Sequence, residues 1–422
     1  MQLQKYKVIM AFLALGLLLP LAFSYSQSAS ELQNKISDHN ETIKKLDEEI
    51  KTYQTQVEAV NNEAKSLQSA IQVLDINQKK ITTEIKKAET NIAKSNLALK
   101  ELGGEILSTE DKINNNTRAI SETLNTMRQS EEQSLIEHIL INKSLSDILD
   151  EYESVTQFQE KIREKSTELA SYKEDLSIKK SATEKEKSKL LAFKSELGDQ
   201  NQILVNNKKE KSNLLAATKN QEAEYKKILT KKQAEKERFE RELFEFESQL
   251  KRVIDPNSFP SPGKGILHWP LDNVFVTQPF GKTVDSKRLY SSGTHNGVDF
   301  RASRGTRVLA ALSGVVTGTG NTDAQRGCYS YGKWVLLAHP NGLSTLYAHL
   351  DLIKVSSGQS VETGEVIGYS GQTGYATGPH LHLTLYASQG VEVQRYSQSI
   401  NCKNTDIPIA DRDAYLDPMD YF

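Results

Sequence analysis

The spacing of apolar residues changes along the chain near residue 255. From Ile43 to Leu74, successive apolar positions are separated alternately by three and four residues, with charged and amide side chains between them. This spacing is the heptad pattern of a coiled coil, and it resumes at Ile81. We therefore expect residues 29–254 to form long helices joined through an apolar seam.

A seam of this length needs a partner. An antiparallel hairpin supplies one from the same chain, with residues 162–250 as the returning arm. A parallel homodimer satisfies the same heptads, and the heptads alone do not distinguish the two arrangements. The pattern loosens at the pair Gly103-Gly104 and at the run from Asn114 to Asn116. Because glycine disfavours a helix interior, we expect the helix to break or bend at the glycine pair.

One stretch of the helical region, residues 135–149, is too apolar for a two-stranded seam. It predicts a short helical insert around residues 131–155, packed across the far end of the hairpin. Apolar surface exposed on an otherwise polar rod is typical of a docking site. The insert is therefore also a candidate contact for a partner.

Proline and glycine end the helical region. All ten prolines except Pro20 lie at Pro256 or later, and residues 255–264 read as a semi-rigid linker. From residue 265 to residue 422, short runs of Val, Leu, Thr and Tyr alternate with glycine-containing turns. The fold class expected is therefore α+β and multidomain: long antiparallel coiled-coil helices followed by a mostly antiparallel β domain.

The first 28 residues have the order of a secretory signal peptide. Lys5 and Lys7 precede an apolar run from Val8 to Phe23, and small polar residues follow. We expect export to the periplasm or the cell surface with cleavage near Ser26 to Ser30, and a retained membrane anchor is the alternative. No later segment is apolar enough to span a bilayer.

The balance of charge indicates no nucleic-acid or membrane-surface partner, and the two cysteines favour a disulfide. The 53 basic and 55 acidic residues nearly cancel, so the charge gives no argument for binding to nucleic acid or to an anionic membrane surface. Only two cysteines occur, Cys328 and Cys402, and in an exported protein they favour one disulfide that closes a long loop. Two unpaired buried thiols are the alternative. Their wide spacing argues against zinc ligation.

Chemistry concentrates between residues 295 and 382. On a strand, residues two or four apart face the same way, so His295 with Asp299, and His380 with His382, can each project a pair into one cleft. Two imidazoles and a carboxylate are the ligands of a catalytic zinc that keeps one position open. His295, Asp299 and one of the last two histidines supply that set. His349 and the other histidine then remain to move a proton and stabilise an oxyanion.

Residues 269–421 resemble the lysostaphin/LytM-type zinc metallopeptidases. The matching segments are residues 277–281, 295–300, 305–311, 347–350 and 370–382. The resemblance implies a zinc endopeptidase that cleaves peptide cross-links of bacterial peptidoglycan. By motif position it makes His295, Asp299 and His382 the zinc ligands, and His349 and His380 the catalytic histidines.

Two features depart from that family. Thr384 stands where the family often has an acidic residue. We expect this difference to alter the hydrogen bonding that supports a metal ligand. Residues 320–331 look like an insertion that reshapes one wall of the groove. For His339 and His268 we expect structural roles.

The helical region resembles, more weakly, the coiled coils of division-associated murein hydrolases and activators of the EnvC and PcsB kind. That resemblance implies a membrane ABC-transporter-like partner complex and a peptidase held inactive until signalled. The function expected is an exported zinc metalloendopeptidase for cell-wall remodelling or daughter-cell separation, regulated through its coiled coil. The alternatives are a non-catalytic activator of a partner amidase and a structural scaffold that binds the wall.

Overall fold

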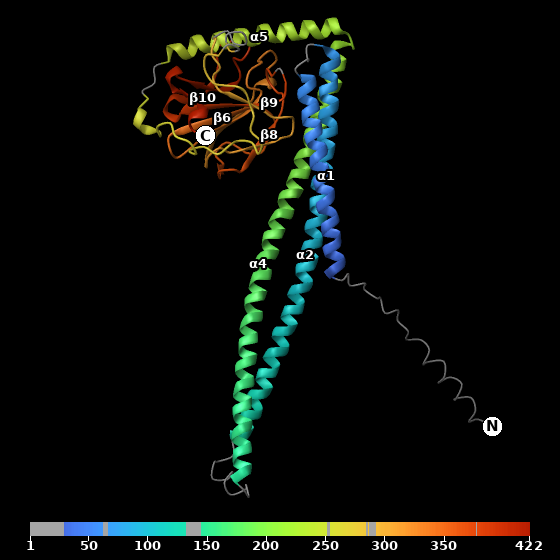
Figure 1. The fold of residues 1–422 in the computed structure, drawn as a ribbon. Coiled ribbons are helices and arrows are strands. Elements are labelled where there is room, and N and C mark those ends of the chain that lie inside the picture. The colour runs from blue at the N-terminus through green and yellow to red at the C-terminus, as the bar shows by residue number, and fades with distance from the viewer. Residues whose placement is uncertain are drawn as a thin grey trace, which may run out of the picture. The chain divides into compact units, whose positions relative to one another are not determined.

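In the computed structural model, the described residues form four long helices followed by a β domain (Figure 1). The structure describes residues 29–61, 66–131, 145–250, 254–283, 286, 293–376 and 378–422. The helices are α1 (Ala29–Asn61), α2 (Leu67–Glu131), α4 (Leu145–Thr218) and α5 (Glu222–Gln249). Contacts divide the chain into two units, one made of residues 42–92 and 191–422, the other of residues 93–190 with those before residue 42.

The expected antiparallel pairing of the helices is confirmed. In the unit that contains residues 93–190, Thr109 of α2 bonds to Asp175 of α4, and Asn116 bonds to Glu168. Residue numbers therefore rise along α2 as they fall along α4. Thr109 and Asn116 are buried polar residues, and polar residues in such a seam fix its register at some cost in stability.

The expected break at the glycine pair is wrong. Helix α2 continues without interruption through Gly103, Gly104 and the run from Asn114 to Asn116. A glycine costs a helix about 1 kcal/mol relative to alanine, which the packing of the flanking turns outweighs. Asn116 is held by its bond to Glu168.

The helical region also turns back once more than expected. Helix α1 ends at Asn61 and α2 begins at Leu67, after Ser66 accepts the Ser69 N–H at 3.1 Å. Val57 of α1 packs with Val73 and Ile76 of α2. The three-and-four spacing continues across this reversal, so the pattern could not reveal it.

The returning arm is shorter than expected. Helix α4 ends at Thr218, and Lys219 and Asn220 adopt left-handed backbone conformations, with φ of 50° and 56°. Helix α5 then packs on the β domain, with Phe239 and Leu243 buried. From Phe239 to Leu250 its packed apolar residues keep the heptad spacing, which does not identify the surface that they cover.

The β domain is a twisted sheet of antiparallel pairs. Its strands are β1 (Val276–Gln278), β2 (Val298–Arg301), β3 (Arg307–Leu309), β4 (Gly314–Asn321), β5 (Lys333–Ala338), β6 (Leu343–Ile353), β7 (Ser360–Val361), β8 (Val366–Ser370), β9 (His380–Ala387), β10 (Val391–Arg395), β11 (Asp406–Ala410) and β12 (Tyr415–Leu416). The main order is β1-β2-β9-β6-β5-β4-β7, and β10 pairs with β11 separately. Short 3-10 turns lie at Pro256–Ser258, Thr322–Ala324, Ser388–Gly390, Arg412–Ala414 and Pro418–Asp420.

The β domain has a continuous apolar core and one disulfide. Val298, Phe300, Leu337, Tyr347 and Leu383 are among its fully buried residues. The expected disulfide between Cys328 and Cys402 is present. It lies in a cluster with Phe239 and Leu243 of α5.

Two expectations lie outside the described residues. These are the signal peptide at residues 1–28 and the part of the apolar insert at residues 132–144. Residues 145–155, at the end of the expected insert, are the first residues of α4. No helix in the described part of the chain has the length and apolar character that crossing a bilayer requires.

Candidate metal centre

Three polar side chains are placed side by side by two central strands and by an isolated β-bridge. Asp299 of β2 and His382 of β9 are direct partners across the antiparallel pair. His295 precedes β2 and exchanges both of its backbone hydrogen bonds with Gly281. Directly opposite residues on one sheet face have Cβ atoms about 5 Å apart. The sheet register therefore brings these side chains together.

The three side chains offer ligand atoms at metal-site spacing. His295 Nε2 lies 3.2 Å from His382 Nδ1. Asp299 Oδ1 lies 3.3 Å from His295 Nε2 and 2.8 Å from His382 Nδ1. Tetrahedral zinc bonds of about 2.0 Å separate neighbouring ligand atoms by about 3.3 Å. All three residues are buried, so the set fits a zinc ion in size and in ligand type.

The other ring nitrogen of each ligand histidine also has a partner. His295 Nδ1 donates to the Pro279 carbonyl at 3.0 Å, and Nε2 is the nitrogen that faces the other two ligands. His382 Nε2 lies 3.0 Å from Thr384 Oγ1, which can accept a hydrogen bond from it, while Nδ1 faces Asp299 Oδ1. Such partners fix the tautomer and the ring orientation of a metal-binding histidine.

His349 and His380 complete the cluster. Nδ1 of each ring donates a hydrogen bond to a backbone carbonyl at 2.8 Å, from His349 to Thr373 and from His380 to Gly378. Nδ1 is therefore the nitrogen that each ring uses for its carbonyl contact, and Nε2 lies on the opposite side of the ring. Their ring centroids are 4.7 Å apart, and His380 Nε2 lies 3.7 Å from Asp299 Oδ1. The structure thus brings together all five residues that the sequence singled out.

Burial and neighbouring charge set the protonation states. Burial holds the pKa of His349 well below its ordinary value, and burial also lowers the pKa of His382. Burial by itself would raise the pKa of Asp299, but His380, His295 and His382 outweigh it and hold that pKa well below the usual range. The lowered pKa values of Asp299 and His382 favour an ionised carboxylate and a neutral imidazole, the forms in which these two residues can bind a metal ion.

Other residues at the site were not foreseen as contacts. The Pro279 carbonyl lies in the expected lead-in segment, but a backbone acceptor leaves no mark in residue type. Tyr331 is the last residue of the expected insertion, and its hydroxyl lies 3.4 Å from Asn296 Nδ2. The Tyr331 ring centroid is 6.4 Å from that of His382. Thr384 was visible in the sequence as a departure from the family pattern.

The two remaining histidines of the β domain contact other groups. His339 is buried and bonds to the Ser313 carbonyl and to Thr345 Oγ1. His268 is exposed, and its Nδ1 contacts the Trp269 carbonyl.

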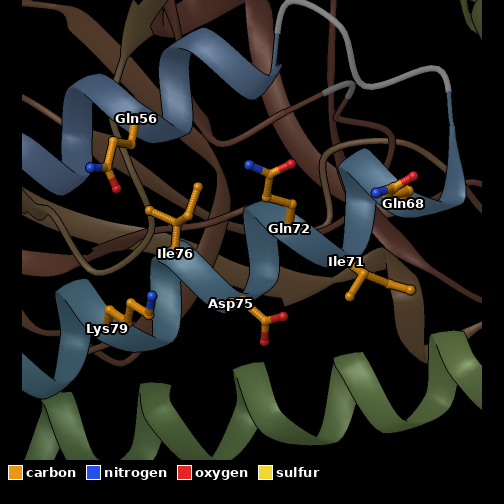
Figure 2. Close-up of a pocket in the computed structure, with 7 residues that line it drawn as sticks. All are labelled: Gln56, Gln68, Ile71, Gln72, Asp75, Ile76 and Lys79. Carbon is orange, nitrogen blue, oxygen red and sulfur yellow. The ribbon is translucent and has the colours of Figure 1, made fainter.

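A separate hollow lies among the helices (Figure 2). Its volume is about 550 Å³, and it is lined by Gln56, Gln68, Ile71, Gln72, Asp75, Ile76 and Lys79. None of the five clustered residues lines it. Its lining holds a single carboxylate, Asp75, which is paired with Lys211.

Residues 293–395 match peptidase family M23. The region that holds the cluster is therefore an M23 peptidase domain, and the resemblance expected from its motifs is confirmed. The region is 41% identical over 113 residues to the DD-carboxypeptidase/endopeptidase Mpg of Neisseria meningitidis serogroup B, covering 27% of this chain and 24% of that protein.

Two further relatives are also similar over one domain only. The peptidoglycan DD-endopeptidase ShyA of Vibrio cholerae is 33% identical over 152 residues, covering 35% of this chain and 31% of ShyA. The cell division protein DipM of Caulobacter vibrioides is 34% identical over 124 residues, covering 29% of this chain and 18% of DipM. The chain thus spans less than a third of each of these relatives, and the similarity concerns one domain.

Proposed function

We propose that this protein is an exported zinc metalloendopeptidase that hydrolyses peptide cross-links of bacterial peptidoglycan. The observation that carries the proposal is the convergence of His295 Nε2, Asp299 Oδ1 and His382 Nδ1 within 3.3 Å of one another. Three protein ligands of these types leave a fourth position open, as in catalytic rather than structural zinc sites. The match of residues 293–395 to peptidase family M23 supports the same assignment.

The five residues have distinct proposed roles. His295, Asp299 and His382 are the zinc ligands, and a bound zinc would supply Lewis-acid polarisation of the scissile carbonyl. His349 and His380 are the proposed catalytic residues, each held by a hydrogen bond from Nδ1 to a backbone carbonyl. One of them would take a proton from the attacking water and return it to the leaving amine. A protonated imidazole would also donate a hydrogen bond to the oxygen on which negative charge develops.

The proposed biological setting is the cell wall. The names of ShyA, a peptidoglycan DD-endopeptidase, and DipM, a cell division protein, support a role in cell-wall remodelling or daughter-cell separation. A secretion signal at residues 1–28 agrees with a substrate outside the cytoplasm. The proposed location is the periplasm or the cell surface.

The proposed domain extents are a signal peptide at residues 1–28, a coiled-coil regulatory region at 29–254, a linker at 255–264 and a peptidase at 265–422. Regulation through the helices is supported by α5, whose Lys236 ammonium lies 4.7 Å from the centre of the Tyr375 ring. Tyr375 is two residues from Thr373, the carbonyl partner of His349. A membrane ABC-transporter-like complex is the proposed partner of the coiled coil.

The test is release of soluble muropeptides from purified sacculi by the full-length protein. We expect release that a chelator abolishes, that added zinc restores, and that His295→Ala and His380→Ala each reduce by at least about a hundredfold. His268→Ala is the matched control, because His268 is exposed and lies outside the cluster. Mass analysis of the products would identify the bond that is cut.

No release by folded, zinc-loaded protein would contradict the peptidase assignment. If the same protein stimulated a partner amidase, the non-catalytic activator would replace it. Binding to sacculi with neither release nor stimulation would favour the structural scaffold.

A further inference from the structure

The turn between β2 and β3 is held by helices α2 and α4. Lys80 of α2 is fully buried, and its Nζ donates to the Arg304 carbonyl at 2.7 Å. Gln200 of α4 donates to the Gly305 carbonyl at 3.1 Å. A side chain at Gly305 would meet Gln200 and Glu84 within 3.3 Å. These helix segments and the β domain belong to one unit, so the turn lies close against the helices.

The Arg304 side chain joins the helices to strand β6. Its Nε and Nη2 donate to the two carboxylate oxygens of Asp351 at 2.6 and 2.7 Å. Its Nη1 donates to Glu210 of α4. Arg304 and Asp351 are each only 2% exposed. A buried guanidinium depends on all of its partners, because losing one leaves charge uncompensated.

Asp351 lies two residues beyond His349, at an irregular point of β6. The pairing of β5 with β6 shifts register between Val335 and Lys333, so β6 contains a bulge there. His349 lies in the bulge with a φ of 59°. A non-glycine residue in this left-handed region is strained and persists only where its surroundings hold it.

Several contacts clamp this bulge. The His349 N–H donates to the Tyr331 carbonyl at 2.8 Å. The next two carbonyls also have partners, Leu350 accepting from Thr373 Oγ1 and Asp351 accepting from Lys333 Nζ. The ion pair of Arg304 with Asp351 fixes the side chain at the end of the same segment. Of these contacts, the one through Arg304 continues into the helices.

We propose that Asp351 and Arg304 are positioning residues that fix the conformation of the bulge bearing His349. Through the contact of Glu210 with Arg304, this conformation would also depend on the docking of α4. The helical region would then support the geometry of the site through a specific ionic contact. The expected effect on catalysis rests on the function proposed above, whereas the expected effect on the backbone does not.

The test uses the full-length protein and two matched carboxylate-to-amide variants on α4. Glu210→Gln removes the charge that faces Arg304. Asp199→Asn removes a second contact of α4 with the β domain, in which Asp199 accepts from Lys354 Nζ at 2.8 Å and from the Tyr369 hydroxyl at 3.1 Å. The Glu210 side chain is 43% exposed, so its amide variant is expected to fold. Asp351→Asn tests the central ion pair.

Hydrogen exchange at the His349 amide, kcat, KM and bound zinc are measured for each variant. We expect Asp351→Asn to speed exchange at His349 and to lower kcat, each about tenfold, with KM and zinc content unchanged. For Glu210→Gln we expect exchange at His349 to be about threefold faster and kcat about threefold lower. The effect is smaller because the partly exposed Glu210 carboxylate is screened by solvent. Asp199→Asn should leave both at the wild-type values.

Two results would overturn the proposal. One is wild-type exchange at His349 in both Glu210→Gln and Asp351→Asn. The other is an equal effect of Asp199→Asn, which would show only that docking in general matters. If the wild-type protein released no muropeptides, the proposed function would fail, and hydrogen exchange at His349 would still decide whether the clamp exists.

Discussion

Three imidazoles of the site are each oriented by a backbone carbonyl. His295, His349 and His380 donate their Nδ1 protons to the carbonyls of Pro279, Thr373 and Gly378. Each ring is thereby held with Nε2 on the side away from the carbonyl. His382 differs, because its Nε2 contacts a side chain, Thr384 Oγ1. That contact can therefore be removed by substitution without altering the backbone.

Thr384→Val is expected to weaken zinc binding about tenfold, because His382 then loses the acceptor that favours its metal-binding tautomer. The measurement is competition for zinc with a chromogenic chelator. Thr384→Ser keeps the hydroxyl and is the control, with wild-type affinity expected. Equal zinc affinity of the valine variant and the wild type would remove Thr384 from the support of the site.

The spacing of residues in the sequence was enough to predict two pairs of the cluster, and the resemblance to the lysostaphin/LytM-type peptidases implied the role of each of the five residues. Neither predicted the supporting contacts. His295 with Asp299, and His380 with His382, occur at separations that place side chains on one strand face, and so could be paired from sequence. The carbonyls of Thr373 and Gly378 could not be assigned, because any residue type offers one. The left-handed conformation of His349 was hidden for a related reason, since no glycine marks it.

At the scale of elements, helix α5 carries a buried carboxyl group. Glu247 Oε1 accepts from the Ala410 N–H at 3.1 Å and from the Tyr415 hydroxyl at 2.9 Å. Burial raises the pKa of Glu247 to about 7, although these hydrogen bonds and Arg412 oppose the rise. The folded protein therefore holds a proton on Glu247 at pH values where the unfolded chain has released it.

This pKa makes stability depend on pH. Below the unfolded pKa of about 4.5 both states are protonated; as pH rises to about 7 the unfolded state ionises first, and stability falls. Glu247→Gln is neutral and keeps an acceptor for both hydrogen bonds. We expect it to raise the free energy of unfolding by about 3 kcal/mol at pH 8 and by much less at pH 4.5.

Thermal melts of Glu247→Gln and wild type across this pH range make the measurement. Glu242→Gln is the matched control for an amide replacement on α5, where Glu242 accepts from Ser399 Oγ at 2.7 Å. A difference between Glu247→Gln and wild type that did not grow with pH would contradict the buried-carboxyl account.

At the scale of the whole molecule, helical segments and the β domain share one unit. Residues 42–92 and 191–249 belong to the unit that contains the M23 peptidase domain. The heptads predicted helices with a shared apolar seam, but they did not distinguish an antiparallel hairpin from a parallel dimer. They also did not predict the reversal after Asn61 or the docking of α5. A repeat of 3.5 residues shows which side of a helix is buried, and it does not identify the partner.

Removing the helices is therefore expected to destabilise the β domain. Residues 255–422 alone would expose the disulfide cluster that Phe239 and Leu243 cover, and would leave Arg304 without Glu210. We expect an unfolding temperature several degrees below that of the full-length protein. Residues 222–422, which keep α5, should lie between the two. Equal melting temperatures for all three proteins would contradict the packing described.

The most direct test of the proposed zinc site is the zinc content of three purified full-length proteins after dialysis. Wild type is expected to retain about one zinc ion per chain, Asp299→Ala less than about a tenth of that amount, and His349→Ala about one. His349→Ala should nevertheless release no muropeptides. If zinc is retained by the wild type and by His349→Ala but not by Asp299→Ala, the proposed ligand is distinguished from the proposed catalytic residue. A wild-type protein without zinc, or equal loss in both variants, would contradict the account.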